Sequence, residues 1–72
     1  MMQSHFGYNL RHLRRKAGLS QVALAARAGI ANTTLCQYER EHQEPRVRIA
    51  YRLAVSLGTS MDTLCAERIR SD

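Results

Sequence analysis

Apolar residues recur along this chain at the spacing of amphipathic helices. The first such stripe, at i, i+4, i+7 and i+11, is formed by Phe6, Leu10, Leu13 and Ala17. It predicts a helix over about 5–17, with Ser4 as a candidate N-cap. Three glycines, at 18, 29 and 58, follow helical stretches, where a left-handed C-cap favours glycine. They divide the chain into short, consistent pieces.

Four further helices follow from the same pattern. Ser20 and Ser60 are candidate caps for the second and the last of them, and Pro45 is expected to open the fourth at its first turn. The expected ranges are 21–28, a start at 31 or 32 through 40, 46–57, and a short helix after 60. The inward positions of the first three are Leu24, Ala25, Ala28, Leu35, Tyr38, Val47, Ala50, Leu53, Ala54 and Leu57, and the last helix contains Met61, Leu64 and Cys65. Because no segment alternates like a strand, the predicted class is all-α.

Length and composition fit one small domain. The chain has 72 residues and 44% apolar residues, enough for a single modest core over about 5–66 within one domain, 1–72. No apolar run approaches the roughly 18 residues of a membrane span, and residues 1–5 lack the pattern of a signal peptide. We therefore expect a cytoplasmic protein with no membrane partner.

Charge is distributed unevenly. The net charge is +5, yet residues 1–38 contain five basic and no acidic residues, whereas 39–72 contain six of each. Such a one-sided basic field suits a polyanion, although a basic face kept for solubility gives the same pattern.

The sequence shows no pattern of a metal site, cofactor site or enzyme. Cys36 and Cys65 lie 29 residues apart, and the three histidines at 5, 12 and 42 complete no ligand spacing. No phosphate-binding loop occurs, and no nucleophile has an evident base. We expect no metal, no cofactor and no enzymatic activity.

Residues 20–40 fit a helix-turn-helix unit. Ala25 is small where the third helix would cross the second, and Gly29 permits a positive φ in the turn. Counted from Gln21, the fitting positions are Leu24, Ala25, Ala28, Gly29, Ile30, Leu35 and Tyr38.

These positions also carry a family resemblance. The matching residues are Leu19-Ser20-Gln21, Leu24-Ala25, Ala28-Gly29, Leu35, Tyr38-Glu39, Pro45, Leu53-Ala54, Leu57-Gly58 and Ser60-Met61-Asp62. The chain resembles lambda-repressor-like (Cro/CI, XRE) helix-turn-helix domains over about 6–65. The resemblance implies a compact five-helix bundle with its third helix in the major groove of DNA. Two positions depart from the family pattern: Glu41 replaces a usual Gly, which would extend helix 3 or alter the loop, and Ala31 replaces a usual Ser or Thr cap, which would leave Asn32 to cap.

The third helix should turn a polar edge outward. Thr33, Gln37 and Arg40 stand at i, i+4 and i+7, opposite the inward Leu35 and Tyr38. Asn and Gln can bond adenine bidentately, and a Thr methyl can meet a thymine methyl. The resemblance assigns base readout to Asn32, Thr33, Gln37 and Gln21. The alternative is that these are ordinary solvated polar residues.

Contacts to DNA phosphates form a second class of candidates. The amides that begin the second helix, near Ser20, offer an anion seat. Arg11, Arg40, His42 and Arg46 could add charge, or belong to a plain soluble surface.

Two structural roles complete the sequence-based hypotheses. The resemblance makes Arg14 and Glu39 a partly buried ion pair. A single domain of this size recognises only a few base pairs, so useful specificity implies a homodimer on double-stranded DNA. Its expected interface is Tyr51, Met61, Leu64, Cys65 and Ile69, with core roles as the alternative for Met61 and Leu64. The sequence fits a phage-type repressor, a restriction-modification controller or a plasmid-type regulator equally, and leaves open an antitoxin-like protein with a toxin partner or another protein-interaction module.

Overall fold

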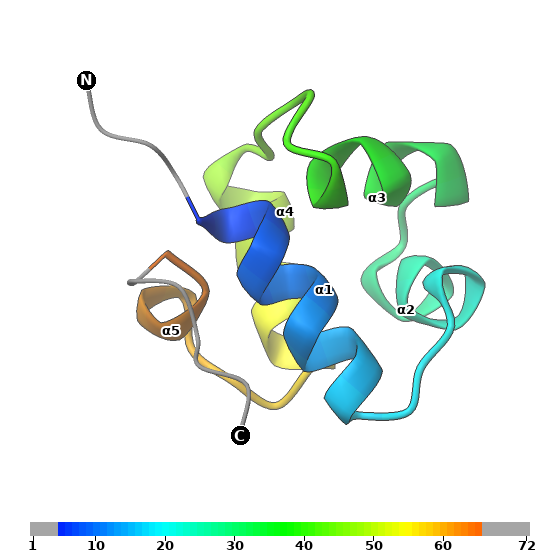
Figure 1. Cartoon of the computed structure of the whole chain (residues 1–72), viewed down its shortest axis with the longest axis horizontal. Helices are drawn as coiled ribbons and strands as arrows, with labels where there is room; N and C mark the ends of the chain where they lie inside the picture. The colour runs from blue at the N-terminus through cyan, green and yellow to red at the C-terminus, as the bar shows by residue number, and fades with distance from the viewer. Residues whose placement is uncertain (1–4, 66–72) are drawn as a thin grey trace.

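The computed structural model describes residues 5–65 of the chain as five helices packed into a bundle (Figure 1). The helices are α1 (Phe6–Lys16), α2 (Gln21–Ala28), α3 (Asn32–Glu39), α4 (Val47–Ser56) and α5 (Met61–Cys65). No strand occurs within 5–65, so the predicted all-α class is confirmed. Within the same range, no helix has both the length and the apolar character to cross a membrane.

The bundle places α3 at one side, where it packs on both α1 and α2. In Figure 1, α1 crosses the front, α4 lies behind it, and α3 runs along the upper edge with its outer side uncovered by another helix. The remaining contacts join α2 to α4, and α5 to α1 and α4. One side of α3 therefore packs against α1 and α2, and its opposite side is not covered by another helix.

The local signals around α2 and α3 act as predicted. Ser20 Oγ accepts a hydrogen bond from the Ala23 N–H at 3.0 Å, which is the capping arrangement at the start of α2. Gly29 ends α2 in the left-handed region, with φ of +71°. Ala31 is the N-cap of α3 and Asn32 is its first residue, so Asn32 does not cap. The alternative of an Asn32 cap is wrong.

The start of α1 differs from the sequence interpretation. Its N-cap is His5, which makes no side-chain cap bond to any described residue, and the candidate cap Ser4 lies outside the described residues. The Tyr8 N–H instead donates to Glu41 Oε2 at 3.3 Å. A carboxylate from the loop after α3 thus faces the positive end of α1, where helix dipoles favour negative charge.

Glu41 takes the backbone conformation of the glycine it replaces. Its φ is +62°, the only positive value at a non-glycine residue in 5–65. Helix α3 ends at Glu39, so the alternative that Glu41 extends this helix is wrong. The loop keeps a glycine-like turn at a cost of about 1–2 kcal/mol for a residue with a Cβ.

Gly7 is the glycine that the sequence left without a role, and it lies where α1 meets the end of α3. A Cβ built there would lie 2.5 Å from Tyr38 O and 3.0 Å from Glu39 O, and would clash with Glu41 Cγ. The two backbones approach so closely because position 7 has no side chain.

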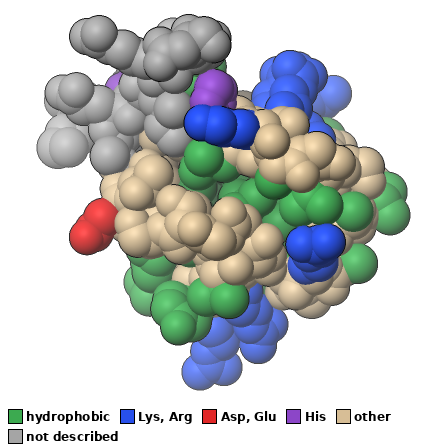
Figure 2. Space-filling model, turned by 90° about the horizontal axis from the view of Figure 1, so that it is seen from below, with side chains coloured by type: hydrophobic (Ala, Val, Ile, Leu, Met, Phe, Trp, Pro, Cys, Tyr) green, Lys and Arg blue, Asp and Glu red, His purple; other side chains and the backbone are tan. Residues whose placement is uncertain are grey.

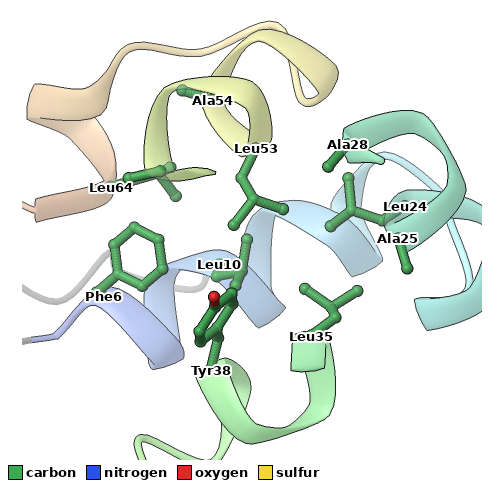
Figure 3. Close-up of a cluster of buried hydrophobic side chains, with 11 residues drawn as sticks. Phe6, Leu10, Leu24, Ala25, Ala28, Leu35, Tyr38, Leu53, Ala54 and Leu64 are labelled. Carbon is green, nitrogen blue, oxygen red and sulfur yellow. The ribbon is translucent and has the colours of Figure 1, made fainter. Parts of the chain in front are cut away.

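The core consists of apolar side chains from all five helices (Figure 3). Its buried members are Phe6, Leu10, Leu24, Ala25, Ala28, Leu35, Tyr38, Ala50, Leu53, Ala54 and Leu64. Ala17 and Val47 were expected inside and are exposed. Helix α1 ends one residue earlier than expected, with Ala17 as its C-cap. Helix α4 starts one residue later than expected, at Val47, with Arg46 as its N-cap. Pro45 therefore precedes the cap instead of lying in the first turn.

A buried asparagine joins the last helix to the first. Asn9 is completely inaccessible, and its Nδ2 donates to Leu64 O at 3.1 Å and Thr63 O at 3.5 Å. Since the carbonyls at a helix end lack partners within the helix, this amide satisfies two groups that burial would otherwise penalise.

Candidate nucleic-acid interface

The outward edge of α3 is polar and exposed. Asn32, Thr33 and Gln37 are all exposed, whereas Leu35 behind them is completely buried. Tyr38, also buried, anchors the same side, and the two apolar residues point into the core in Figure 3. Three of the four side chains proposed from the sequence to contact bases are therefore exposed on α3, which is fixed from behind, and the fourth, Gln21, lies on α2.

Two shallow recesses adjoin this edge. One lies between α3 and the following loop and is lined by Thr33, Cys36, Gln37, Arg40 and His42. The other lies between α1, the start of α2 and α3, and is lined by Arg11, Arg14, Arg15, Gln21, Cys36, Glu39 and Arg40. Because both recesses include Cys36 and Arg40, they form a continuous hollow surface, which we call the α3 surface.

A buried ion pair supports the α3 surface from below. Arg14 Nε lies 2.6 Å from Glu39 Oε2, and Arg14 Nη2 donates to Glu39 Oε1 at 3.1 Å, so the guanidinium grips the carboxylate with two bonds. The two side chains are 11% and 3% exposed. Arg14 Nη1 also donates to Leu19 O at 2.9 Å. The predicted pair is thus present and ties α1 to the end of α3 and to the turn before α2.

Gln21 belongs to the same network, which the sequence did not indicate. Its Nε2 donates to Glu39 Oε1 at 3.1 Å, and the residue is half-buried. Its carbonyl oxygen and second N–H remain for another partner. A hydrogen bond that holds the amide in place reduces the rotamer entropy lost when that partner binds.

The start of α2 lies beside this network. Ser20 is exposed, its hydroxyl oxygen caps the helix, and the amides of the first turn point outward from the N-terminus. Such a terminus carries a partial positive charge and attracts anions. Of the predicted phosphate ligands, Arg11, Arg40 and His42 line the α3 surface, whereas Arg46, exposed at the cap of α4, lines neither recess.

The face turned away from α3 has a different character (Figure 2). There the Lys and Arg side chains stand at separate places, with hydrophobic and uncharged atoms between them. Beside α3, by contrast, Arg11, Arg15 and Arg40 share one recess.

The expected dimer residues are only partly accessible. Leu64 is completely buried, so its assignment to an interface is wrong. It is the residue by which α5 contributes to the core. Met61 is half-buried and packs against the core, Tyr51 and Cys65 are exposed, and Ile69 lies outside the described residues.

The exposed Tyr51 belongs to a stripe on α4 whose two other members were not predicted to be exposed. Val47, Tyr51 and Val55 are 74%, 59% and 59% exposed, at i, i+4 and i+8. Their spacing could have shown that they share one side of a helix. It could not have shown that this side faces outward, because α4 also carries a complete inward stripe.

Known proteins match both the sequence and the fold. The family model HTH_3, described as helix-turn-helix, matches residues 10–64. An uncharacterised HTH-type transcriptional regulator of Sinorhizobium fredii, y4dJ, is 39% identical over 59 residues, which cover 82% of this chain and 77% of that protein. The P22 c2 repressor in complex with a synthetic operator has a TM-score of 0.80 at 32% identity, over 88% of this chain and 94% of that one.

Two other structures show the same likeness. The restriction-modification controller protein C.AhdI of Aeromonas hydrophila has a TM-score of 0.81 at 31% identity, over 85% of this chain and 92% of that one. SinR, the master regulator for biofilm formation, in complex with DNA has a TM-score of 0.78 at 30% identity, over 82% and 95%. The chain therefore belongs to the HTH_3 helix-turn-helix family, the lambda-repressor-like (XRE) group of DNA-binding transcription regulators.

Proposed function

We propose that this chain represses transcription by binding a specific palindromic site in double-stranded DNA as a homodimer, with α3 in the major groove. The observation that carries the proposal is the outward polar edge of α3, with Thr33 and Gln37 exposed while Leu35 and Tyr38 fix the helix from behind. A rigidly held helix presents its side chains at a defined spacing, which direct base readout requires.

The roles of the edge residues follow from their chemistry. Gln37 can bond N6 and N7 of an adenine, and Thr33 can place its methyl group against a thymine methyl. Asn32 stands at the N-terminal end of α3, the end that meets base edges in helix-turn-helix docking. Because Ala31 occupies the cap position, the Asn32 side chain is available for DNA. Gln21, held by Glu39, would contact a phosphate or an outer base edge.

Backbone contacts would surround these residues. The first-turn amides of α2 beside Ser20 suit one phosphate, and Arg11 and Arg40 in the recess suit its neighbours. His42, in the loop after α3, and Arg46, at the cap of α4, would add contacts on the way to α4. Together these groups would fix the depth and register of the helix in the groove without reading sequence.

A second copy is expected because one domain reads too few base pairs to single out an operator. The face we favour for the dimer joins the exposed Tyr51 with Val47 and Val55, and extends to Met61 and Cys65. Two copies would then read half-sites about one helical turn, or about 34–36 Å, apart. We expect the protein to act in the cytoplasm, where its DNA target would lie, with no cofactor and no enzymatic activity.

A protein partner is the second candidate. The same stripe on α4 could hold another protein, such as a toxin, and one structural neighbour is the SinR protein in complex with the SinI protein, with a TM-score of 0.82 at 30% identity. This candidate predicts a protein whose interactions depend little on salt and need no duplex.

A duplex titration separates the two. Fluorescence anisotropy with a labelled duplex, over a salt series from 50 to 200 mM, should give log affinity falling steeply with log salt, by about 0.9 for each phosphate contacted. Selected palindromic sites should bind two copies in sedimentation and should silence a reporter promoter that contains them. A flat salt dependence, or no duplex bound at low salt, would reject the proposal in favour of a protein partner.

A further inference from the structure

The outward face of α1 carries a basic recess of its own. It is lined by Tyr8, Arg11, His12 and Arg15. The rings of Tyr8 and His12 stack, with centroids 6.3 Å apart and planes inclined by 12°. Arg11 and Arg15 are both exposed and lie one helical turn apart, so their side chains start from the same side of α1.

This recess continues the α3 surface. Arg11 and Arg15 also line the recess that contains Gln21, Cys36 and Arg40, so the same two side chains border both hollows. A line of recesses therefore runs from the outward edge of α3, past the start of α2, onto α1. Arg11 and Arg15 therefore stand at the border between the α3 surface and the α1 recess.

Basic groups outnumber acidic groups along this line, although the Glu41 carboxylate accepts a hydrogen bond from the Tyr8 N–H at the start of α1. Among the described residues that line the two recesses at α1, Glu39 is the only carboxylate, and Arg14 already binds it with two bonds. Residues 5–38 contain no acidic residue at all. Helices α1 and α2 therefore contain no acidic residue that could pair with Arg15. A surface guanidinium without such a partner can bind an external anion.

We infer that Arg15, with His12 beside it, binds the phosphodiester backbone of the duplex beyond the bases that α3 reads, so that the footprint of each copy extends along α1. The inference rests on the proposed function, since it assigns a new contact to the same DNA. Four residues of helix span about 6 Å, which lets Arg11 and Arg15 meet different phosphates. This contact adds affinity and no base preference.

The test compares three single variants in the salt series. Arg15→Gln should lower the slope of log affinity against log salt by about 0.9, which corresponds to one lost phosphate contact. The ratio of wild-type to variant affinity should consequently shrink about 3.5-fold between 50 and 200 mM salt. Lys16→Gln removes the adjacent charge, which lines neither recess, and Arg48→Gln removes an exposed arginine from α4; both should keep the wild-type slope.

A footprint supplies the second measurement. Ethylation of single phosphates should interfere with binding of the wild type at one flanking phosphate per half-site, and that signal alone should vanish in Arg15→Gln. A slope equal to that of Lys16→Gln, or an unchanged interference pattern, would overturn the inference while the wild type still binds DNA. A wild type that binds no duplex would overturn the proposed function together with it. All three side chains are exposed, so unchanged thermal melts will show that the fold is intact.

Discussion

Removing Arg14 should destabilise the fold more than removing any exposed arginine. Arg14→Ala deletes two bonds to the Glu39 carboxylate and one to Leu19 O. The carboxylate stays behind at 3% exposure, and the hydrogen bond from the Gln21 amide is the one that remains among the described side chains. The carboxylate remains largely buried without its cationic partner, so a charge is left poorly compensated.

The magnitude is a large share of the total stability. Breaking a buried pair by removing one partner costs about 3–5 kcal/mol. A chain of 72 residues, at roughly 0.05–0.15 kcal/mol per residue, has about 4–11 kcal/mol in all. Since 1 kcal/mol shifts the Tm of a domain of this size by about 4–8 °C, the melting temperature should fall by roughly 12–40 °C.

Thermal and urea melts followed by circular dichroism measure this loss. The matched control is Arg14→Met/Glu39→Met, which removes both charges, keeps most of the buried volume and should recover most of the stability. Arg11→Gln, on the exposed side of α1, should melt as the wild type does. An Arg14→Ala variant with an unaltered melt, or a double variant as unstable as the single one, would refute the reasoning.

Three other substitutions or modifications test separate features. Gly7→Ala should destabilise by about 1–3 kcal/mol in urea melts, because its Cβ meets backbone that cannot yield; an unchanged midpoint would contradict this. Glu41→Gly should be about 1 kcal/mol more stable than Glu41→Ala, since both lose the carboxylate facing α1 and only Ala keeps a Cβ at positive φ; equal stability would show that φ is unstrained. In a Cys65→Ser background, a specific duplex should slow maleimide labelling of Cys36, and an unchanged rate would place DNA elsewhere.

The helices could be predicted from the sequence because their signals are local. The serine before α2 and the glycine after it decide where that helix starts and stops, whatever surrounds them. The start of α4 is not decided by its proline, since a proline fits both the first turn of a helix and the residue before its N-cap. Val47, the first residue of α4, was expected to point inward and is 74% exposed.

Features that depend on contacts between distant segments could not be predicted. Gly7 is needed by the backbone of residues 38 and 39, and Asn9 by carbonyls more than fifty residues away. Glu41 fits a glycine position because its carboxylate has a role at α1. The periodicity of a single helix cannot reveal these three roles, since each role depends on how two distant segments approach one another.

The candidate site shows the same division. The outward position of Thr33 and Gln37 followed from the inward stripe of their own helix. The bond between Gln21 and Glu39 did not, because it joins two helices through a carboxylate already assigned to Arg14. Its consequence is that one network holds the fold together and orients a proposed DNA contact, so variants at Glu39 should affect both.

Selection of bound duplexes from a random library, with wild type and Gln37→Ala in parallel, tests the central claim most directly. The account predicts a palindromic motif for the wild type and, for Gln37→Ala, the same motif with preference relaxed at one position per half-site by about 1–3 kcal/mol. The exposed position of Gln37 should leave the melt unchanged. Identical motifs for the two proteins, or no enriched motif for the wild type, would contradict the role assigned to α3.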